Sequence, residues 1–415
     1  MSTVRTPFVA RDMLAMVKKS GKEREKRARV ALTHDLKGCS TAVLPQALRY
    51  KPGNELLQFW GMSYGAFLGG TFASLYPERV GRMIVDGCGD WVDNASGKFQ
   101  GYLIDTEREW HEFFNLCYAA GPEKCALYDE KGPVAMQQSI DKLLSDLKTH
   151  PIVVSKEDML FPEVFAETHL FQAIFKSLYR PYRSQTWVTL VETLAGLING
   201  TIAPAIFDML PSRKLRTSTD GCRTPDCVTE YMGEGSWTEF NFGVYCPDSP
   251  DFRNTTKSES IAWVEGLKRQ SPLFGGPFAL SSMFVCAGYP IRPKWRFDGP
   301  FRGKTKVPML FIGNSMDPVA PLEGTKLNIA GFEGARLLQQ DSVGHCSVNA
   351  PSQCTVGYIR KYLVSGELPE AGTVCPVDFS PFDDGKQDEY TNLQWLSTVQ
   401  DARCCGWIAG TRHNV

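Results

Sequence analysis

The pentapeptide Gly61-Met62-Ser63-Tyr64-Gly65 has the G-x-S-x-G pattern that can hold a serine hydroxyl ready for nucleophilic attack. The pattern is common by chance, and its alternative interpretation is a glycine-rich turn with an incidental serine. Here, however, an apolar run (55–61) precedes it and many small residues follow it. A strand before the serine and a closely packed helix after it would expose the hydroxyl at a sharp turn. We therefore expect Ser63 to be a nucleophile and the backbone N–H of Tyr64 to be an oxyanion donor.

A serine hydroxyl is a weak nucleophile at neutral pH and needs a base, which a third group must orient. The chain contains six histidines: His34, His111, His150, His169, His345 and His413. Only His345 follows a late apolar strand in a turn, and Gly344 beside it relieves crowding. His413 lies in the C-terminal tail, where a fixed geometry is not expected. The predicted base is therefore His345.

The orienting acid should follow a strand between the serine and the histidine, because the chain order in this arrangement is serine, acid, histidine. Asp317 comes directly after the apolar run VPMLFIGNSM, and Pro318 and Pro321 would stiffen its turn. Asp86, at the end of an earlier apolar strand, is the alternative. The sequence favours Asp317 and leaves Asp86 open.

The elements that must position these residues follow an α/β pattern. Apolar runs predict four buried strands, at 55–61, 80–88, 307–317 and 335–345. The first two enclose a helix of small residues and form a βαβ unit, whose strands should be parallel. A helix is expected at 6–19, with the charged run KKSGKEREKRAR after it as a solvated face, and a closing helix at 352–369. Helical periodicity predicts four helices between the two α/β parts, at 102–116, 134–147, 164–179 and 186–197.

Composition excludes several other classes. The chain has 415 residues, of which 43% are hydrophobic and 22% charged, and its net charge is −1. A basic surplus for nucleic acid is absent, and no apolar run is long enough for a transmembrane helix or a signal peptide. No phosphate loop or dinucleotide fingerprint occurs. We expect no cofactor, no metal, and no nucleic-acid or membrane partner.

Thirteen cysteines and three N-x-S/T sequons, at Asn94, Asn199 and Asn254, would suit an exported protein, although no signal peptide is visible; localisation stays open. Cys117 and Cys125 flank a turn and could pair. Cys222 and Cys227 have a spacing seen in zinc sites, but no histidine lies within 50 residues, which favours disulfides or free thiols.

Several segments resemble the prolyl aminopeptidase and tripeptidyl aminopeptidase-like group of α/β-hydrolases, especially its fungal members. They are LQFWGMSYGAFLGGTFASLYPERVGRMIVDG around Ser63, VPMLFIGNSMDPVAPLEG around Asp317, DSVGHCSVNAPSQCTVGYIRKYLVSGELPEAGTVCPVD around His345, and the shorter TPFVARDM and FFNLCYAAGPEKCALY. The resemblance is weak over roughly 130–270. It implies a helical cap over the site and a triad of Ser63, Asp317 and His345.

One departure from the family concerns the oxyanion hole. In the family, strands and a Gly-Gly-Pro-Gly-type loop precede TPFVARDM, and that loop donates half of the hole. This chain begins too late to contain them, so we expect an N-terminally shortened sheet with the strand at 55–61 near its edge. Gly275-Gly276-Pro277 follows the nucleophile, in the wrong order for that loop, and is interpreted as a turn.

These observations predict an α/β-hydrolase sheet, N-terminally shortened, with a large, mostly helical cap insertion. The expected parts are a first core part (1–98) with the nucleophile, the insertion (99–295), and a second core part (296–415) with the acid and histidine. The expected function is serine hydrolysis of an amide or ester, aminopeptidase-like on short peptides as the resemblance implies. The alternatives are an esterase, lactonase or thioesterase of a fungal secondary-metabolite pathway, and a catalytically impaired remnant with a binding role. The substrate and the oligomeric state are not predicted.

Overall fold

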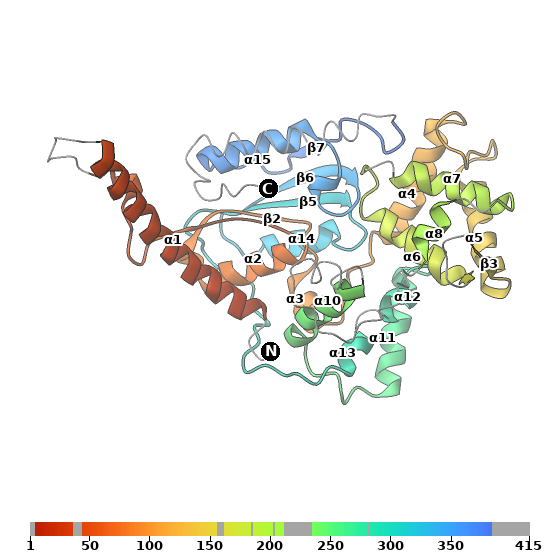
Figure 1. Ribbon diagram of the computed structural model, residues 1–415, viewed down its shortest axis with the longest axis horizontal. Coiled ribbons are helices and arrows are strands. Elements are labelled where there is room, and N and C mark those ends of the chain that lie inside the picture. Colours follow the sequence, from red (N-terminus) through yellow and green to blue (C-terminus); the bar gives the residue numbers. More distant parts are fainter. Residues whose placement is uncertain are drawn as a thin grey trace.

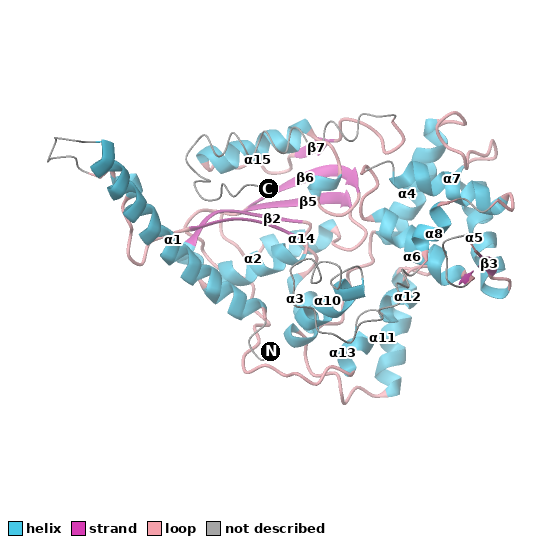
Figure 2. Cartoon of the chain, in the orientation of Figure 1, coloured by secondary structure: helices cyan, strands magenta, loops and turns pink. Residues whose placement is uncertain are grey.

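A parallel sheet of five strands lies at the centre of the molecule (Figures 1 and 2), in the order β1-β2-β5-β6-β7. The computed structural model describes residues 5–35, 44–155, 162–183, 186–201, 204–210, 235–280 and 283–383. The strands of the sheet are β1 (Leu57–Met62), β2 (Val80–Asp86), β5 (Leu310–Met316), β6 (Arg336–Val343) and β7 (Val374–Pro376). The first four confirm the predicted strands, and β1 lies at one end of the order, as expected.

The first two strands are joined through a helix of small residues, α2 (Tyr64–Leu75), and run parallel. The predicted βαβ unit is therefore confirmed. The other helices packed around the sheet are α1 (Thr6–Asp35), α3 (Trp91–Ser96), α14 (Leu322–Ile329) and α15 (Gln353–Ser365).

Both faces of the sheet are covered, as a parallel sheet requires. On one face, Ala10 and Met13 of α1 and Phe67 and Phe72 of α2 pack with strand residues such as Val85 in one apolar cluster. On the other face, α15 contributes Ile359 and Tyr362, which pack with residues of β2, β5 and β6. The three layers hold the carboxyl ends of the strands at a common edge, where the predicted site residues lie.

The N-terminal helix is longer than the sequence periodicity predicted. It continues through the charged run to Asp35, and its outer half projects from the body of the molecule (Figure 1). The continuation has alternating charges at helical spacing, and Glu23–Arg27 and Glu25–Arg29 form i,i+4 ion pairs. The apolar pattern ended at residue 19 because beyond it the helix no longer packs against the sheet.

The segment between the two α/β parts is mostly helical and lies largely beyond the carboxyl ends of the strands (Figure 1). Its helices are α4 (Thr106–Ala120), α5 (Pro133–Thr149), α6 (Glu167–Leu178), α7 (Thr186–Ile198), α8 (Ala205–Met209), α10 (Gly235–Asp248), α11 (Lys257–Gln270), α12 (Gly275–Leu280) and α13 (Met283–Ala287). Its aromatic-rich cluster includes Trp110, Phe113 and Trp187, all fully buried. The four predicted helices are present, and the boundaries 98/99 and 295/296 stay a prediction.

Two local features differ from expectation. An antiparallel pair, β3 (Ile152–Val154) with β4 (Glu163–Phe165), is too short to show a period in the sequence. Gly275-Gly276-Pro277 is the first turn of α12 and not a separate turn, so that interpretation was wrong. Gly275 is required there, because a Cβ would lie 2.3 Å from the carbonyl oxygen of Leu267 on α11.

Three disulfides join described residues: Cys117–Cys125, Cys246–Cys286 and Cys354–Cys375. The first confirms the predicted pair, whereas Cys222 and Cys227 lie outside the described residues. Cys88 and Cys346 are free and buried. In the described part of the chain, no helix is both long and apolar enough to cross a bilayer.

Replacing Cys354 and Cys375 by serine should lower the free energy of unfolding by about 3 kcal/mol, the value for closing a loop of this size. The disulfide closes a separation of 21 residues and ties β7 to α15. Urea denaturation measures the change, and Cys88→Ala, at a buried free thiol, is the control. An equal loss in both variants would show that packing alone explains the effect.

Candidate active site

Ser63 is the single residue between β1 and α2, and it adopts an unusual backbone conformation, with φ 55° and ψ −120°. L residues rarely occupy this region, and strain of this kind gathers at functional turns. The amide N–H of Ser63 donates to the carbonyl oxygen of Asp86 at 2.9 Å, which ties the turn to the end of β2. The residue itself is exposed. The sharp turn predicted from the pentapeptide is therefore present.

The two glycines of the pentapeptide have different roles. A Cβ on Gly61 would lie 2.2 Å from the backbone oxygen of Gly65, closer than real Cβ atoms approach. A Cβ on Gly65 would meet nothing within 4 Å. The close crossing of strand and helix therefore requires glycine only at position 61.

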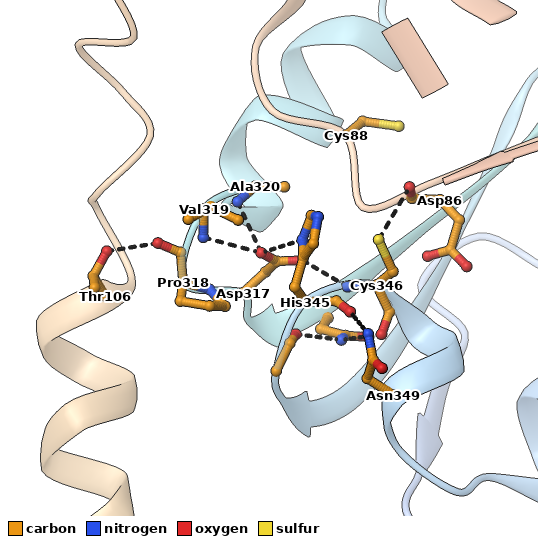
Figure 3. Close-up of polar contacts among 12 residues, drawn as sticks. Asp86, Cys88, Thr106, Asp317, Pro318, Val319, Ala320, His345, Cys346 and Asn349 are labelled. Atoms are coloured by element: carbon orange, nitrogen blue, oxygen red, sulfur yellow. Dashed lines mark hydrogen bonds and ion pairs between the residues drawn. The ribbon is translucent and has the colours of Figure 1, made fainter. Parts of the chain in front are cut away.

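Asp317 and His345 form a buried pair at the ends of β5 and β6 (Figure 3). Both carboxylate oxygens of Asp317 lie 2.9 Å from Nδ1 of His345. The carboxylate also accepts the backbone N–H groups of Cys346 (3.0 Å), Val319 (3.1 Å) and Ala320 (2.8 Å). Asp317 is 0% exposed, so these donors replace its water and fix its orientation. The structure thus brings the predicted acid and base together.

The surroundings of His345 affect both the pKa and the orientation of its imidazole. Burial lowers the pKa of His345, but the charge of Asp317 and the hydrogen bond to it outweigh this, and the net pKa is raised. The ring of Tyr179 packs edge-on at 5.3 Å, and the Tyr179 carbonyl accepts the backbone N–H of His345 at 3.1 Å. These contacts leave the ring little freedom to turn.

Nε2 of His345 is buried and has no hydrogen-bond partner among the described residues. Ser63 therefore does not bond to it in this structure, although both belong to the same edge of the sheet. The carbonyl of Asp86 receives the N–H of Ser63 and, at 3.7 Å, the thiol of Cys346, the residue after His345. The serine turn and the histidine loop thus meet at the end of β2. Hydrogen bonds of this kind are often long or unmade before substrate binds.

Asp86, the alternative acid, does not contact the imidazole by a hydrogen bond. Its carboxylate accepts the backbone N–H of Ser347 at 2.9 Å and the Ser347 hydroxyl at 2.6 Å. Burial raises the pKa of Asp86 to about 6, against the opposing effect of these two bonds. Asp86 therefore anchors the loop that carries His345. The structure favours Asp317 as the carboxylate partner of the imidazole.

Tyr64, the expected oxyanion donor, is the first residue of α2. Its backbone N–H belongs to the first turn, where N–H groups have no carbonyl within the helix to bind. The side chain is partly buried, and its hydroxyl lies 2.6 Å from Oγ1 of Thr6. The N–H is thus placed beside Ser63, at the positive end of the helix.

The sequence did not predict the residues of α4 that lie against the loops carrying Asp317 and His345. Oγ1 of Thr106 donates to the carbonyl of Pro318 at 2.6 Å. Glu109, one turn later, is fully buried, and neither of its carboxyl oxygens has a hydrogen-bond partner among the described residues. Burial holds the pKa of Glu109 well above its usual range, and the charge of Asp317 raises it further. Nothing in the spacing of TEREWHEFF marks this glutamate, since it is typical of an exposed helix position.

Comparison with known proteins agrees with this geometry. The family model described as "TAP-like protein" matches residues 271–375, which include Asp317 and His345. The parallel sheet with its strand–serine–helix turn supplies the matching fold. The chain has an α/β-hydrolase fold and is similar to the TAP-like group of these enzymes.

Two curated relatives of this chain are bacterial. The serine protease Hip1 of Mycobacterium tuberculosis is 24% identical over 337 residues, which cover 79% of this chain and 59% of that protein. The tripeptidyl aminopeptidase of Streptomyces lividans is 22% identical over 391 residues, covering 87% and 65%. The chain therefore spans about three fifths of the length of these relatives. Its fungal origin stays a prediction.

Gly61→Ala should disturb the serine turn, because the added Cβ meets the backbone of Gly65 and neither strand nor helix can move freely. We expect a loss of about 1–3 kcal/mol in the free energy of unfolding, as for other overpacked sites. Gly65→Ala is the matched control and should change it by no more than about 1 kcal/mol. Thermal unfolding of both variants measures this, and equal losses would contradict the close crossing at Gly61.

Asp317→Asn should lower kcat by about 10⁴, because the amide would favour the wrong tautomer of His345. Asp86→Asn keeps one acceptor for Ser347 and should lower kcat by no more than about tenfold. Steady-state kinetics on an activated ester compares the two. The reverse order of losses would make Asp86 the acid.

Proposed function

We propose that the chain is a serine hydrolase that cleaves amide or ester bonds through an acyl-enzyme. The observation that carries this proposal is the buried Asp317–His345 pair, whose free Nε2 lies at the sheet edge that also bears the strained turn of Ser63. A serine at such a turn, a base and an orienting acid are the parts of a nucleophilic triad. The similarity to the TAP-like group supports the same chemistry.

In the first step, Oγ of Ser63 attacks the carbonyl carbon of the substrate, and Nε2 of His345 takes the hydroxyl proton. Asp317 holds the proton on Nδ1 and stabilises the imidazolium that forms. The negative charge that develops on the carbonyl oxygen is stabilised by the backbone N–H of Tyr64. The raised pKa of His345 makes it a stronger base than a free imidazole once it is neutral.

In the second step, the imidazolium returns its proton to the leaving amine or alcohol, and the bond to the acyl carbon breaks. Water then attacks the acyl-enzyme while His345 accepts its proton, and Ser63 is released with its hydrogen. Ser63, His345, the leaving group and water thus donate and accept every proton that is transferred.

We propose short peptides as the substrate class, cleaved from their amino end. The names of the relatives, a serine protease and a tripeptidyl aminopeptidase, support peptide-bond cleavage. Esterase activity and binding without catalysis are the other outcomes of the test below.

The test is labelling with a fluorophosphonate probe together with assays on an aminoacyl-arylamide and on p-nitrophenyl acetate. Wild-type protein should label and cleave both, and Ser63→Ala should do neither while its far-UV circular dichroism is unchanged. Ser74→Ala, on the same helix, is the control, because among the described residues the Ser74 hydroxyl bonds only to the carbonyl of Gly70. It should label normally.

Labelling that persists in Ser63→Ala would overturn the assignment of the nucleophile. Cleavage of the ester alone would favour an esterase. A wild-type protein that neither labels nor cleaves would leave a binding role as the better explanation.

A further inference from the structure

The side chain of Tyr64, next to the nucleophile, is held by two segments that are far away in the sequence. Its hydroxyl lies 2.6 Å from Oγ1 of Thr6, at the start of α1. Thr6 in turn is bound to Asp248, at the end of α10, through its hydroxyl on Oδ2 and through its backbone N–H on Oδ1 at 3.3 Å. A chain of hydrogen bonds thus joins the serine turn, the N-terminal helix and the helical segment.

The protons in this chain can have only one order while Asp248 is ionised. The Thr6 hydroxyl has a single proton, and the carboxylate of Asp248 can only accept, so Thr6 donates to Asp248. The tyrosine hydroxyl must then donate to Oγ1 of Thr6. Both oxygens of Asp248 are occupied as acceptors, one by each donor of Thr6.

The surroundings exclude water from these hydrogen bonds, and among the described residues no cation bonds directly to the carboxylate of Asp248. Thr6 is 1% exposed and Asp248 is 7% exposed. Arg5 lies near but donates to the carbonyls of Trp295 and Pro247. Arg296 donates to the carbonyl of Ala95 at 2.9 Å and to the backbone carbonyl of Asp248 at 3.5 Å. Arg5, Arg296 and Tyr64 are the charged or titratable groups that face Asp248.

We propose that Thr6 and Asp248 are positioning residues that hold Tyr64, and with it the backbone N–H beside Ser63, and that they do so only while Asp248 is ionised. This inference rests on the proposed function, because it assigns Tyr64 the oxyanion contact. A proton on Oδ2 of Asp248 would point at Oγ1 of Thr6, so the Thr6 hydroxyl would accept from Asp248 and donate to the tyrosine oxygen instead. Tyr64 would then lose Oγ1 of Thr6 as the acceptor of its hydroxyl proton.

The pH range of this change follows from the burial of Asp248. Burial raises the pKa of Asp248 to about 6, and the Thr6 bonds, Arg5 and Arg296 oppose this. The network is therefore complete above about pH 6 and incomplete below it. Folding stability runs the other way: a pKa raised from 3.8 means that this group favours the fold most below pH 3.8 and that the gain is lost as pH rises past 6.

The experiment compares kcat of the wild type with that of Tyr64→Phe from pH 5 to pH 8. The variant keeps the ring and lacks the hydroxyl. We expect a wild-type advantage of about tenfold at pH 8, as for one well-placed hydrogen bond, falling towards onefold at pH 5 with a midpoint near pH 6. His345 titrates in both proteins, so its effect cancels in the ratio of the two kcat values. KM should be unchanged, because the oxyanion contact acts in the transition state.

Matched variants separate positioning from general stability. Thr6→Val should reproduce the loss, and Thr6→Ser, which keeps the hydroxyl, should restore activity. In an Asp248→Asn background, Tyr64→Phe should have the same small effect at every pH. Tyr362→Phe removes another buried hydroxyl, one that bonds to Met83 and Pro308 on the other face of the sheet, and should change stability without a pH-dependent change in kcat.

A wild-type to Tyr64→Phe ratio that is the same at pH 5 and pH 8 would overturn the inference, and so would full activity of Thr6→Val. Fluorophosphonate labelling of Ser63 tells this failure from failure of the proposed function. If the wild type does not label, the positioning role falls with it. The hydrogen-bond chain itself is then tested by the Tm values of Tyr64→Phe, Thr6→Val and the double variant. At pH 8 the sum of the two single Tm shifts should exceed the Tm shift of the double variant. At pH 5 the sum should not exceed it.

Discussion

The charge of Asp317, buried without water, is the constraint on which the rest of the site depends. Removing a carboxylate from water is costly unless donors replace the lost hydration. Here four groups do so: the imidazole of His345 and the backbone N–H groups of Cys346, Val319 and Ala320. Satisfying one charge therefore fixes two loops, the one after β5 and the one after β6. The orientation of His345 is a result of that requirement.

The helical segment completes this arrangement from outside the sheet. The first turn of α4 meets the acid loop through Thr106, and the end of α6 meets the histidine loop through Tyr179. Glu109 adds a further buried carboxyl close to Asp317, which is tolerated because its raised pKa favours the uncharged form. The chemistry at the sheet edge is thus shaped by residues of the helical segment as well as by the loops of the sheet.

The sequence could predict those parts of the fold and the candidate site that depend on local pattern. The strands β1, β2, β5 and β6 were visible as apolar runs, and Ser63, Asp317 and His345 each follow one of them, so the topology brings them to one edge. The contacts of Thr6 with Asp248 and of Tyr179 with His345 could not be predicted, because they join residues more than 160 positions apart with no shared motif. The full length of α1 was missed for a different reason, since its outer half is held by charge pairs and not by an apolar stripe.

The covalent connectivity of the described chain has a consequence for these long-range contacts. Its disulfides span 8, 40 and 21 residues, and each closes a loop within a single neighbourhood. None of these three crosslinks bridges β1 and β2 to the helices beyond them. Within the described residues, the alignment of the sheet with these helices therefore depends on hydrogen bonds, ion pairs and packing. The sheet and the helices can thus move relative to one another while all three of these disulfides stay intact.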